Sequence, residues 1–167
     1  MDANKSEAER TSELAYRAQR LGEMHAAFPS LVSDNRCLED AIREIHRILN
    51  RGKRFRKFHR IMKLLHSRGY EAGNYRETPQ RGTDYLAPTS KDVPPLMRSF
   101  GEKLDELMRN PMNDEQARLV GGWALAMMIR VHPFADGNGR TTRTLINLIL
   151  AKAGHSTIDF PSDSEIY

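Results

Sequence analysis

The chain has 167 residues, of which 39% are hydrophobic and 29% charged, and its formal net charge is +4. These proportions exclude a disordered or membrane-spanning chain, and the length suits a single domain with its own core. Cys37 is the one cysteine of the sequence, so a disulfide within the chain is excluded and a reducing cytoplasm is the expected location. The charged N-terminus lacks the apolar run of a signal peptide, so no leader is expected.

Two helices are predicted in the first fifty residues. Apolar residues recur on one face between Ser6 and Ala27, and residues 1–35 are expected to form an N-terminal helical extension. Residue types that cap helices occupy Ser33–Asn35, and a second helix is predicted from Cys37 to Leu49. The apolar stripe of this second helix consists of Leu38, Ala41, Ile42, Ile45, Ile48 and Leu49.

A strongly basic segment follows, with seven Lys and Arg residues between Arg51 and Lys63. Phe55, Phe58 and Ile61 recur at helical spacing, which favours a helix with a solvated basic face. A basic amphipathic helix can also contact nucleic acid or an anionic membrane. We favour the solvated face, and nucleic acid is not an expected partner.

Glycines and prolines interrupt the helical pattern between Ser67 and Ser90. Two short extended pieces, Tyr75–Thr78 and Asp84–Leu86, predict an irregular β-hairpin. Such a hairpin needs support from the rest of the protein, and its exposed edge can pair with another extended chain.

Three further helices are predicted. One follows Pro94-Pro95, and its inward-facing residues are Leu96, Met97, Phe100, Leu104 and Leu107. The next is capped by Asn113 or Asp114 and ends near Val131. Its wide apolar stripe, which includes Leu119, predicts a central, largely buried helix. The last runs from about Gly139 to Ala153, with Gly154 as its C-terminal cap. The expected fold is a single all-α domain with one small β-hairpin.

The string HPFADGNGRTTR, residues 132–143, separates the last two predicted helices. Glycines beside a helix start leave backbone N–H groups free to bind an anion, so Gly137, Asn138 and Gly139 are candidate phosphate ligands. Arg140 and Arg143 lie on one face of the first helical turn, where positive charge opposes the helix dipole. An anion with several charges would compensate, so a polyphosphate is expected.

Other residues of the string complete a reaction centre. Asp136 would repel a phosphate unless a cation lay between them, and Mg²⁺ commonly takes one or two carboxylates together with phosphate oxygens. His132 has a reference pKa near ~6.5 and can accept a proton at neutral pH. Pro133 ends the preceding helix and presents the imidazole, and Phe134 is expected to anchor the loop in the core.

Residues 132–143 resemble the signature HxFx(D/E)GNGRxxR of Fic-domain proteins, and every fixed position of that signature is matched. Gly73-Asn74-Tyr75-Arg76 resembles the start of the family's flap hairpin, and Ala87 to Pro94 resembles its end. The resemblance covers about Leu38 to Gly154, and we expect a Fic domain over 36–167 with its flap at about 75–86.

The resemblance implies a protein adenylyltransferase, which moves AMP from ATP to a Ser, Thr or Tyr hydroxyl and releases pyrophosphate. His132 would deprotonate the hydroxyl, and Asp136 would hold Mg²⁺ on the α- and β-phosphates. Gly137, Asn138 and Gly139 would cradle phosphate, with help from the Asn138 side chain. Arg140 would bind the β-phosphate and Arg143 the γ-phosphate.

The flap would pair with the target protein by strand addition and bring its hydroxyl in line with the α-phosphorus. The flap residues expected to dock the target are Tyr75, Arg76, Glu77, Thr78, Asp84, Tyr85 and Leu86. Gly139 favours nucleotidyl transfer, since the kinase-like Doc branch carries lysine there. Other nucleotide or CDP-choline donors stay open, as does a basic binding module without catalysis.

Many Fic proteins are inhibited by a helix with the pattern (S/T)xxxE(G/N), whose glutamate would pair here with Arg143. Ser67 has Glu71 at the right distance but Ala72 follows, and Ser30 is followed by Asp34-Asn35 instead of glutamate. The chain ends at Tyr167, where the family commonly continues into another helix. Inhibition by such a helix, by a separate antitoxin-like protein as in bacterial toxin–antitoxin pairs, or by neither stays open.

Overall fold

The structure is a computed structural model, and it describes residues 37–50, 71–77, 87–158 and 160. Within these ranges the chain forms four α-helices and no strand. The helices are α2 (Leu38–Asn50), α4 (Val93–Met108), α5 (Asp114–Val131) and α6 (Asn138–Lys152). The predicted all-α class is therefore confirmed for this part of the chain. The helix boundaries lie close to the predicted ones, except that α4 begins at Val93, before Pro94-Pro95 and not after them.

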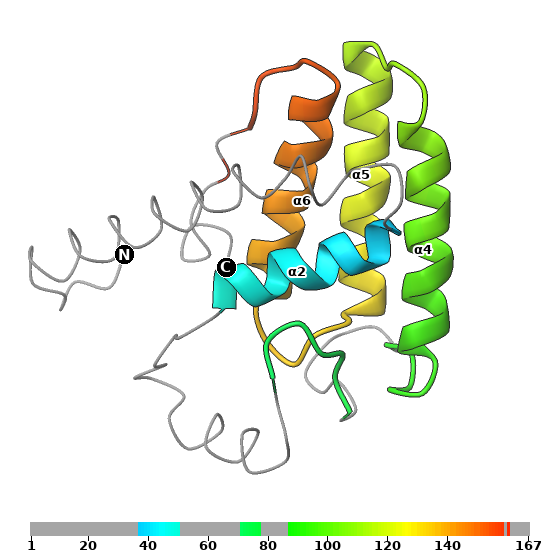
Figure 1. Cartoon of the computed structure of the whole chain (residues 1–167), viewed down its shortest axis with the longest axis vertical. Coiled ribbons are helices and arrows are strands. Elements are labelled where there is room, and N and C mark those ends of the chain that lie inside the picture. Colours follow the sequence, from blue (N-terminus) through cyan, green and yellow to red (C-terminus); the bar gives the residue numbers. More distant parts are fainter. Residues whose placement is uncertain (1–36, 51–70, 78–86, 159, 161–167) are drawn as a thin grey trace, which may run out of the picture.

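Three helices stand in a row and the fourth crosses them (Figure 1). Helix α5 lies between α4 and α6 and contacts both, while α2 crosses the row and contacts α4 and α6. The crossing is close because Gly101 of α4 has no side chain: a Cβ there would lie 2.6 Å from the backbone nitrogen of Glu39. The loop between α5 and α6 emerges at the end of the row, beside the segment 71–77 (Figure 1).

The core lies between α2 and this row. It is built from side chains that the sequence predicted to face inward, among them Ile42, Ile45, Phe100 and Leu104, together with Ile149 of α6. Two predictions of burial were wrong. Leu96 is 37% and Leu119 66% exposed, since each lies on the face of its helix that points away from the neighbouring helices.

Helix α5 is therefore not buried all round, as its apolar composition had suggested. The residues that pack against α4 and α6 recur at three- and four-residue steps. They are Ala117, Val120, Ala124, Met128 and Val131.

Helix ends follow local rules that the sequence carries. Asn113 caps α5: its side chain accepts from the N–H of Gln116, whose own side chain accepts from the N–H of Asn113. At the end of α6, the N–H of His155 donates to Leu150 and that of Gly154 to Ala151, and Gly154 has a φ of 77°. This is the glycine-terminated helix end that was predicted.

Several predictions fall outside the described residues. They concern the helix between Ser6 and Ala27, the Ser33–Asn35 cap, the basic segment Arg51–Lys63 and most of the hairpin, residues 78–86. The hairpin is not seen: residues 75–77, which were expected to begin its first strand, form no strand. Among the described helices, none is long and apolar enough to cross a membrane.

Candidate active site

His132 ends helix α5 in a left-handed backbone conformation, with φ 47° and ψ 60°. Among the described residues it is the one non-glycine residue with a positive φ. Its N–H still donates to Met128 of the helix, so the turn away from the helix occurs at His132 itself. Pro133 follows and cannot continue the helical hydrogen bonding. The local sequence therefore places the imidazole at the C-terminal end of α5.

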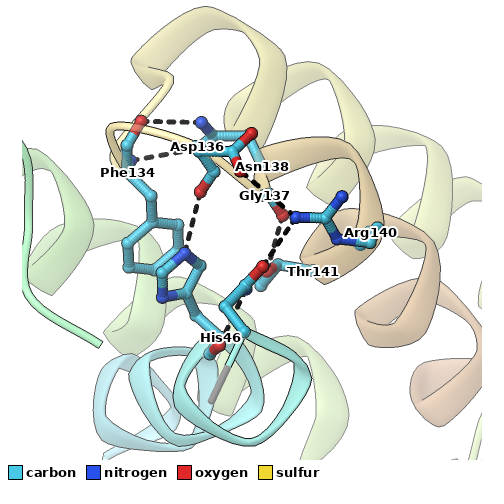
Figure 2. Close-up of polar contacts among 8 residues, drawn as sticks. His46, Phe134, Asp136, Gly137, Asn138, Arg140 and Thr141 are labelled. Atoms are coloured by element: carbon cyan, nitrogen blue, oxygen red, sulfur yellow. Dashed lines mark hydrogen bonds and ion pairs between the residues drawn. The ribbon is translucent and has the colours of Figure 1, made fainter. Parts of the chain in front are cut away.

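The six residues between the two helices are held by hydrogen bonds within the loop itself. Phe134 is fully buried, as predicted for an anchor. The Asn138 side chain forms two hydrogen bonds with the Phe134 backbone, accepting from its N–H at 3.0 Å and donating to its carbonyl at 2.7 Å (Figure 2). These bonds use the amide group of Asn138 to hold the loop, and only 6% of the residue is exposed.

Helix α6 begins as an anion-binding helix end should. Gly137 is its N-cap in a left-handed conformation, φ 79°, and its carbonyl accepts from the N–H of Thr141 at 3.0 Å. That is the first bond of the helical ladder, so the N–H groups of Asn138, Gly139 and Arg140 precede it at the positive end of the helix dipole. Gly139 is exposed, which leaves room for a ligand at this end.

The candidate metal ligand and one candidate phosphate ligand lie together. Arg140 Nη2 is 3.4 Å from Asp136 Oδ2 and donates at 2.7 Å to Oδ1 of Asn50 on α2 (Figure 2). The side chain of Asp136 is 40% and that of Arg140 27% exposed, so both are accessible to a ligand. Arg143 lies one turn further along α6 and is half-buried.

His46, on α2, supports the loop from behind. Its ring stacks on Phe134 with the centroids 3.8 Å apart, and it is fully buried. Nδ1 accepts from the N–H of Gly73 at 2.8 Å, so the proton of the neutral ring resides on Nε2, which donates to the Asp136 carbonyl at 2.8 Å. Burial lowers the pKa of His46 to about 4. A neutral imidazole thus joins α2 to the loop (Figure 2).

The residues that were predicted to begin the hairpin turn inward. Tyr75 donates to Glu39 on α2 at 2.8 Å, and burial together with this bond raises the pKa of its hydroxyl. Arg76 is only 3% exposed, and its guanidinium donates to the carbonyl of His132 at 2.8 Å. The Arg76 side chain is therefore buried behind the loop and is not exposed to a target, while docking of a target along the flap backbone stays a prediction. Glu77 is exposed.

The other residues expected to dock a target lie outside the described residues. They are Thr78, Asp84, Tyr85 and Leu86.

His132 has the electrostatic setting of a base. Desolvation lowers the pKa of its half-buried ring, the positive charge of Arg76 lowers it further, and Asp136 opposes the two. The ring is therefore neutral at pH 7 and able to take a proton from a hydroxyl brought to it. His132, the Asp136 carboxylate and the N-terminus of α6 lie together at one end of the helix row.

Within the described part of the chain, few side chains could help Asp136 to hold the expected metal. Among the described residues, no group of three or more His, Cys, Asp or Glu side chains could hold an ion. A partly exposed single carboxylate suits Mg²⁺ only when phosphate oxygens supply further ligands. Asp136 would therefore hold such a cation only together with phosphate oxygens of a ligand.

The sequence reasoning missed His46 and Asn50. Both lie on the apolar face of α2, where Ile42, His46 and Asn50 follow one another at four-residue steps. Polar residues at two successive core-facing positions are the signal that could have found them, since a buried polar group requires a partner.

Comparison with known proteins assigns this arrangement to a family. The Fic/DOC family model matches residues 36–150. The "Protein adenylyltransferase Fic" of Nematostella vectensis is 38% identical over 93 residues, which are 54% of this chain and 21% of that protein. The protein of the same name from Drosophila grimshawi is 31% identical over 98 residues, 59% of this chain and 20% of that protein. The chain thus spans about a fifth of the length of these curated relatives.

A solved structure shares the fold. The crystal structure of a Fic domain containing signaling protein from Bacteroides thetaiotaomicron superposes with a TM-score of 0.64 at 22% identity. The match covers 98% of this chain and 56% of that one.

Proposed function

The chain belongs to the Fic/DOC family, and on that premise we propose that it is a protein adenylyltransferase, which moves AMP from ATP to a Ser, Thr or Tyr hydroxyl of a target protein. The observation that carries the proposal is one short loop. The loop follows a half-buried, neutral His132 at the end of α5 and carries the accessible Asp136. It leads into the N-terminus of α6, where the side chain of Arg140 is accessible as well. The name of the adenylyltransferase relatives supports AMP as the transferred group.

The proposed reaction uses residues of this chain in named roles. His132 takes the proton of the target hydroxyl, whose oxygen forms a bond to the α-phosphorus while the bond to the β-phosphate oxygen breaks and pyrophosphate leaves. The N–H groups at the start of α6 bind phosphate oxygens, Arg140 the β-phosphate and Arg143 the γ-phosphate. Asp136 would hold Mg²⁺, which would supply charge neutralisation on the phosphates. That the segment at about 75–86 aligns the target by pairing with it stays a prediction.

The Asn138 side chain has a different role from the one expected of it. Its amide holds Phe134 at both polar atoms, so we propose that it shapes the loop while its backbone N–H faces the phosphates. Replacement by Ala would then impair the loop as a whole and not one phosphate contact.

The test is a transfer assay with ATP labelled at either the α- or the γ-phosphate. Purified chain, Mg²⁺ and a cell lysate are combined, and label on protein is measured after denaturation, with His132→Ala as control. We expect label from the α position only, and none with the variant. Label from γ only would establish kinase-like transfer, and no label from either position would point to another nucleotide or to CDP-choline as donor.

A further inference from the structure

We infer that Arg76 is a positioning residue for His132, which holds the left-handed turn that aims the imidazole. This inference rests on the proposed function for its kinetic consequence, but its structural part concerns His132 alone. Arg76 lies near the start of the predicted hairpin, in a stretch that forms no strand, and it is 56 residues from His132, so no local pattern joins the two.

Arg76 binds the chain on both sides of the turn. Its Nε donates to the His132 carbonyl at 2.8 Å, and its backbone N–H donates to the Pro133 carbonyl at 2.8 Å. Its Nη2 donates to the Pro88 carbonyl at 2.6 Å and lies 3.4 Å from the carbonyl of Val131. Three consecutive carbonyls, those of residues 131–133, are thus fixed by one residue.

The turn needs such a constraint. A left-handed conformation costs a non-glycine residue roughly 1 kcal/mol or more, and it persists only where the surroundings impose it. A residue before proline is restricted further. Because the hydrogen bond from Arg76 fixes the peptide that follows His132, it sets ψ of that residue, and the direction of the side chain depends on this backbone.

The same contacts stabilise the positive charge of the buried Arg76 side chain. The carbonyls of Val131 and His132 are at the C-terminus of α5, where the helix dipole is negative and favours a cation. A guanidinium with planar donors can satisfy several of these acceptors at once, whereas an ammonium is a point charge. A buried arginine is therefore stable here although only 3% of it is exposed.

Arg76 is in turn held in place by α2. The N–H of Gly73 donates to His46, and the Gly73 carbonyl accepts from Nε of Arg43 at 2.9 Å. The Tyr75 ring lies 5.8 Å from that of Phe134, and its hydroxyl donates to Glu39. The segment 71–77 is thus attached to α2 at one end and to the base of the turn at the other.

Two variants and a matched control separate positioning from a general structural role. Arg76→Gln removes the charge and most of the donors, Arg76→Lys keeps the charge, and Arg43→Gln loosens the same segment without contact to His132. The first readout is the imidazole titration of His132 by NMR in protein free of metal and nucleotide, with its resonance assigned from His132→Ala. Arg76 and Asp136 are the charged groups that act on this ring.

We expect Arg76→Gln to raise the pKa of His132, because a neighbouring positive charge is lost, and Arg43→Gln to leave it at the wild-type value. We expect Arg76→Lys to titrate like wild type. In the transfer assay, kcat should fall roughly tenfold or more for both Arg76 variants with KM for ATP little changed, since a displaced base slows the reaction and not the binding of nucleotide.

The inference is overturned if Arg76→Gln leaves both the titration and kcat at wild-type values, or if Arg43→Gln reproduces its effects in full. If circular dichroism shows that Arg76→Gln does not fold, the inference is tested with Arg76→Lys instead. An unchanged kcat of Arg76→Lys overturns the inference, and a reduced kcat with an unchanged His132 titration supports it. If wild-type chain transfers no AMP, the titration still tests the inference, and the proposed function is then what fails.

Discussion

The buried ring of His46 should make the stability of the fold depend on pH. Burial lowers its pKa to about 4 in the folded protein, whereas in the unfolded chain the ordinary value of about 6.5 applies. Between these values the unfolded chain binds a proton that the folded protein does not. The contribution of the neutral ring is therefore fully present above pH 6.5 and is lost progressively as the pH falls to 4.

The size of the effect follows from the two pKa values. Their difference of about 2.5 corresponds to about 3.5 kcal/mol in the free energy of unfolding, at about 1.4 kcal/mol for each pKa unit. Between about pH 7 and pH 4.5 most of it is lost, about 2 kcal/mol. On a typical total of roughly 5–15 kcal/mol this is a substantial loss.

Urea unfolding measures this loss, and Trp123 provides the fluorescence signal. Trp123 is the one tryptophan of the sequence, and its ring lies 5.1 Å from that of Phe100 in the core. The comparison variant is His46→Gln, whose amide can donate to the Asp136 carbonyl but does not titrate. At pH 7 it should be less stable by roughly 1–3 kcal/mol, because the contact with Phe134 and the acceptor for Gly73 are impaired.

The decisive quantity is the difference in unfolding free energy between pH 7 and pH 4.5. In His46→Gln this difference should be smaller than in wild type by about 2 kcal/mol, with equal m-values. An unchanged difference would refute the reasoning, since it would mean that His46 is not held neutral by the fold.

Four further substitutions test the geometry by the same urea assay. Gly137→Ala should cost roughly 1–3 kcal/mol or more and weaken nucleotide binding, because φ is 79° and a Cβ would lie 2.6 Å from Oδ1 of Asn50; wild-type behaviour would contradict the N-cap geometry. Gly101→Ala should lower the free energy of unfolding by roughly 1–3 kcal/mol, because the new Cβ would push α4 away from α2. In the control Gly122→Ala the new Cβ would meet no atom within 4 Å, so α5 should gain about 0.5–1 kcal/mol of stability. Equal effects of the two substitutions would argue against the close crossing. Asn113→Ala should cost about 1 kcal/mol through the lost capping box, and no loss would show that the cap is unimportant.

Local patterns predicted most of the described fold. Helices α2, α4, α5 and α6 follow from apolar periodicity and from residues such as Asn113 and Gly154, whose effect on a helix end depends on near neighbours alone. Exposure of Leu119 could not be predicted, because periodicity shows that a face is apolar but not which neighbour covers it.

The candidate site likewise has a part that the sequence predicted and a part that it did not. Residues 132–143 were identified because their roles depend on a single continuous stretch of chain. The support from His46, Asn50 and Arg76 depends on contacts between residues 90 and 56 positions apart, which only the folded arrangement of α2, the segment 71–77 and α5 brings together.

The central claim is that this chain attaches AMP to a protein hydroxyl with His132 as the base. Peptide mass spectrometry of a lysate treated with wild-type chain, ATP and Mg²⁺ tests it most directly, beside an identical sample treated with His132→Ala. We predict peptides that carry AMP on Ser, Thr or Tyr with the wild-type chain and not with the variant. AMP-bearing peptides in equal amount from both samples, or in neither, would contradict the account.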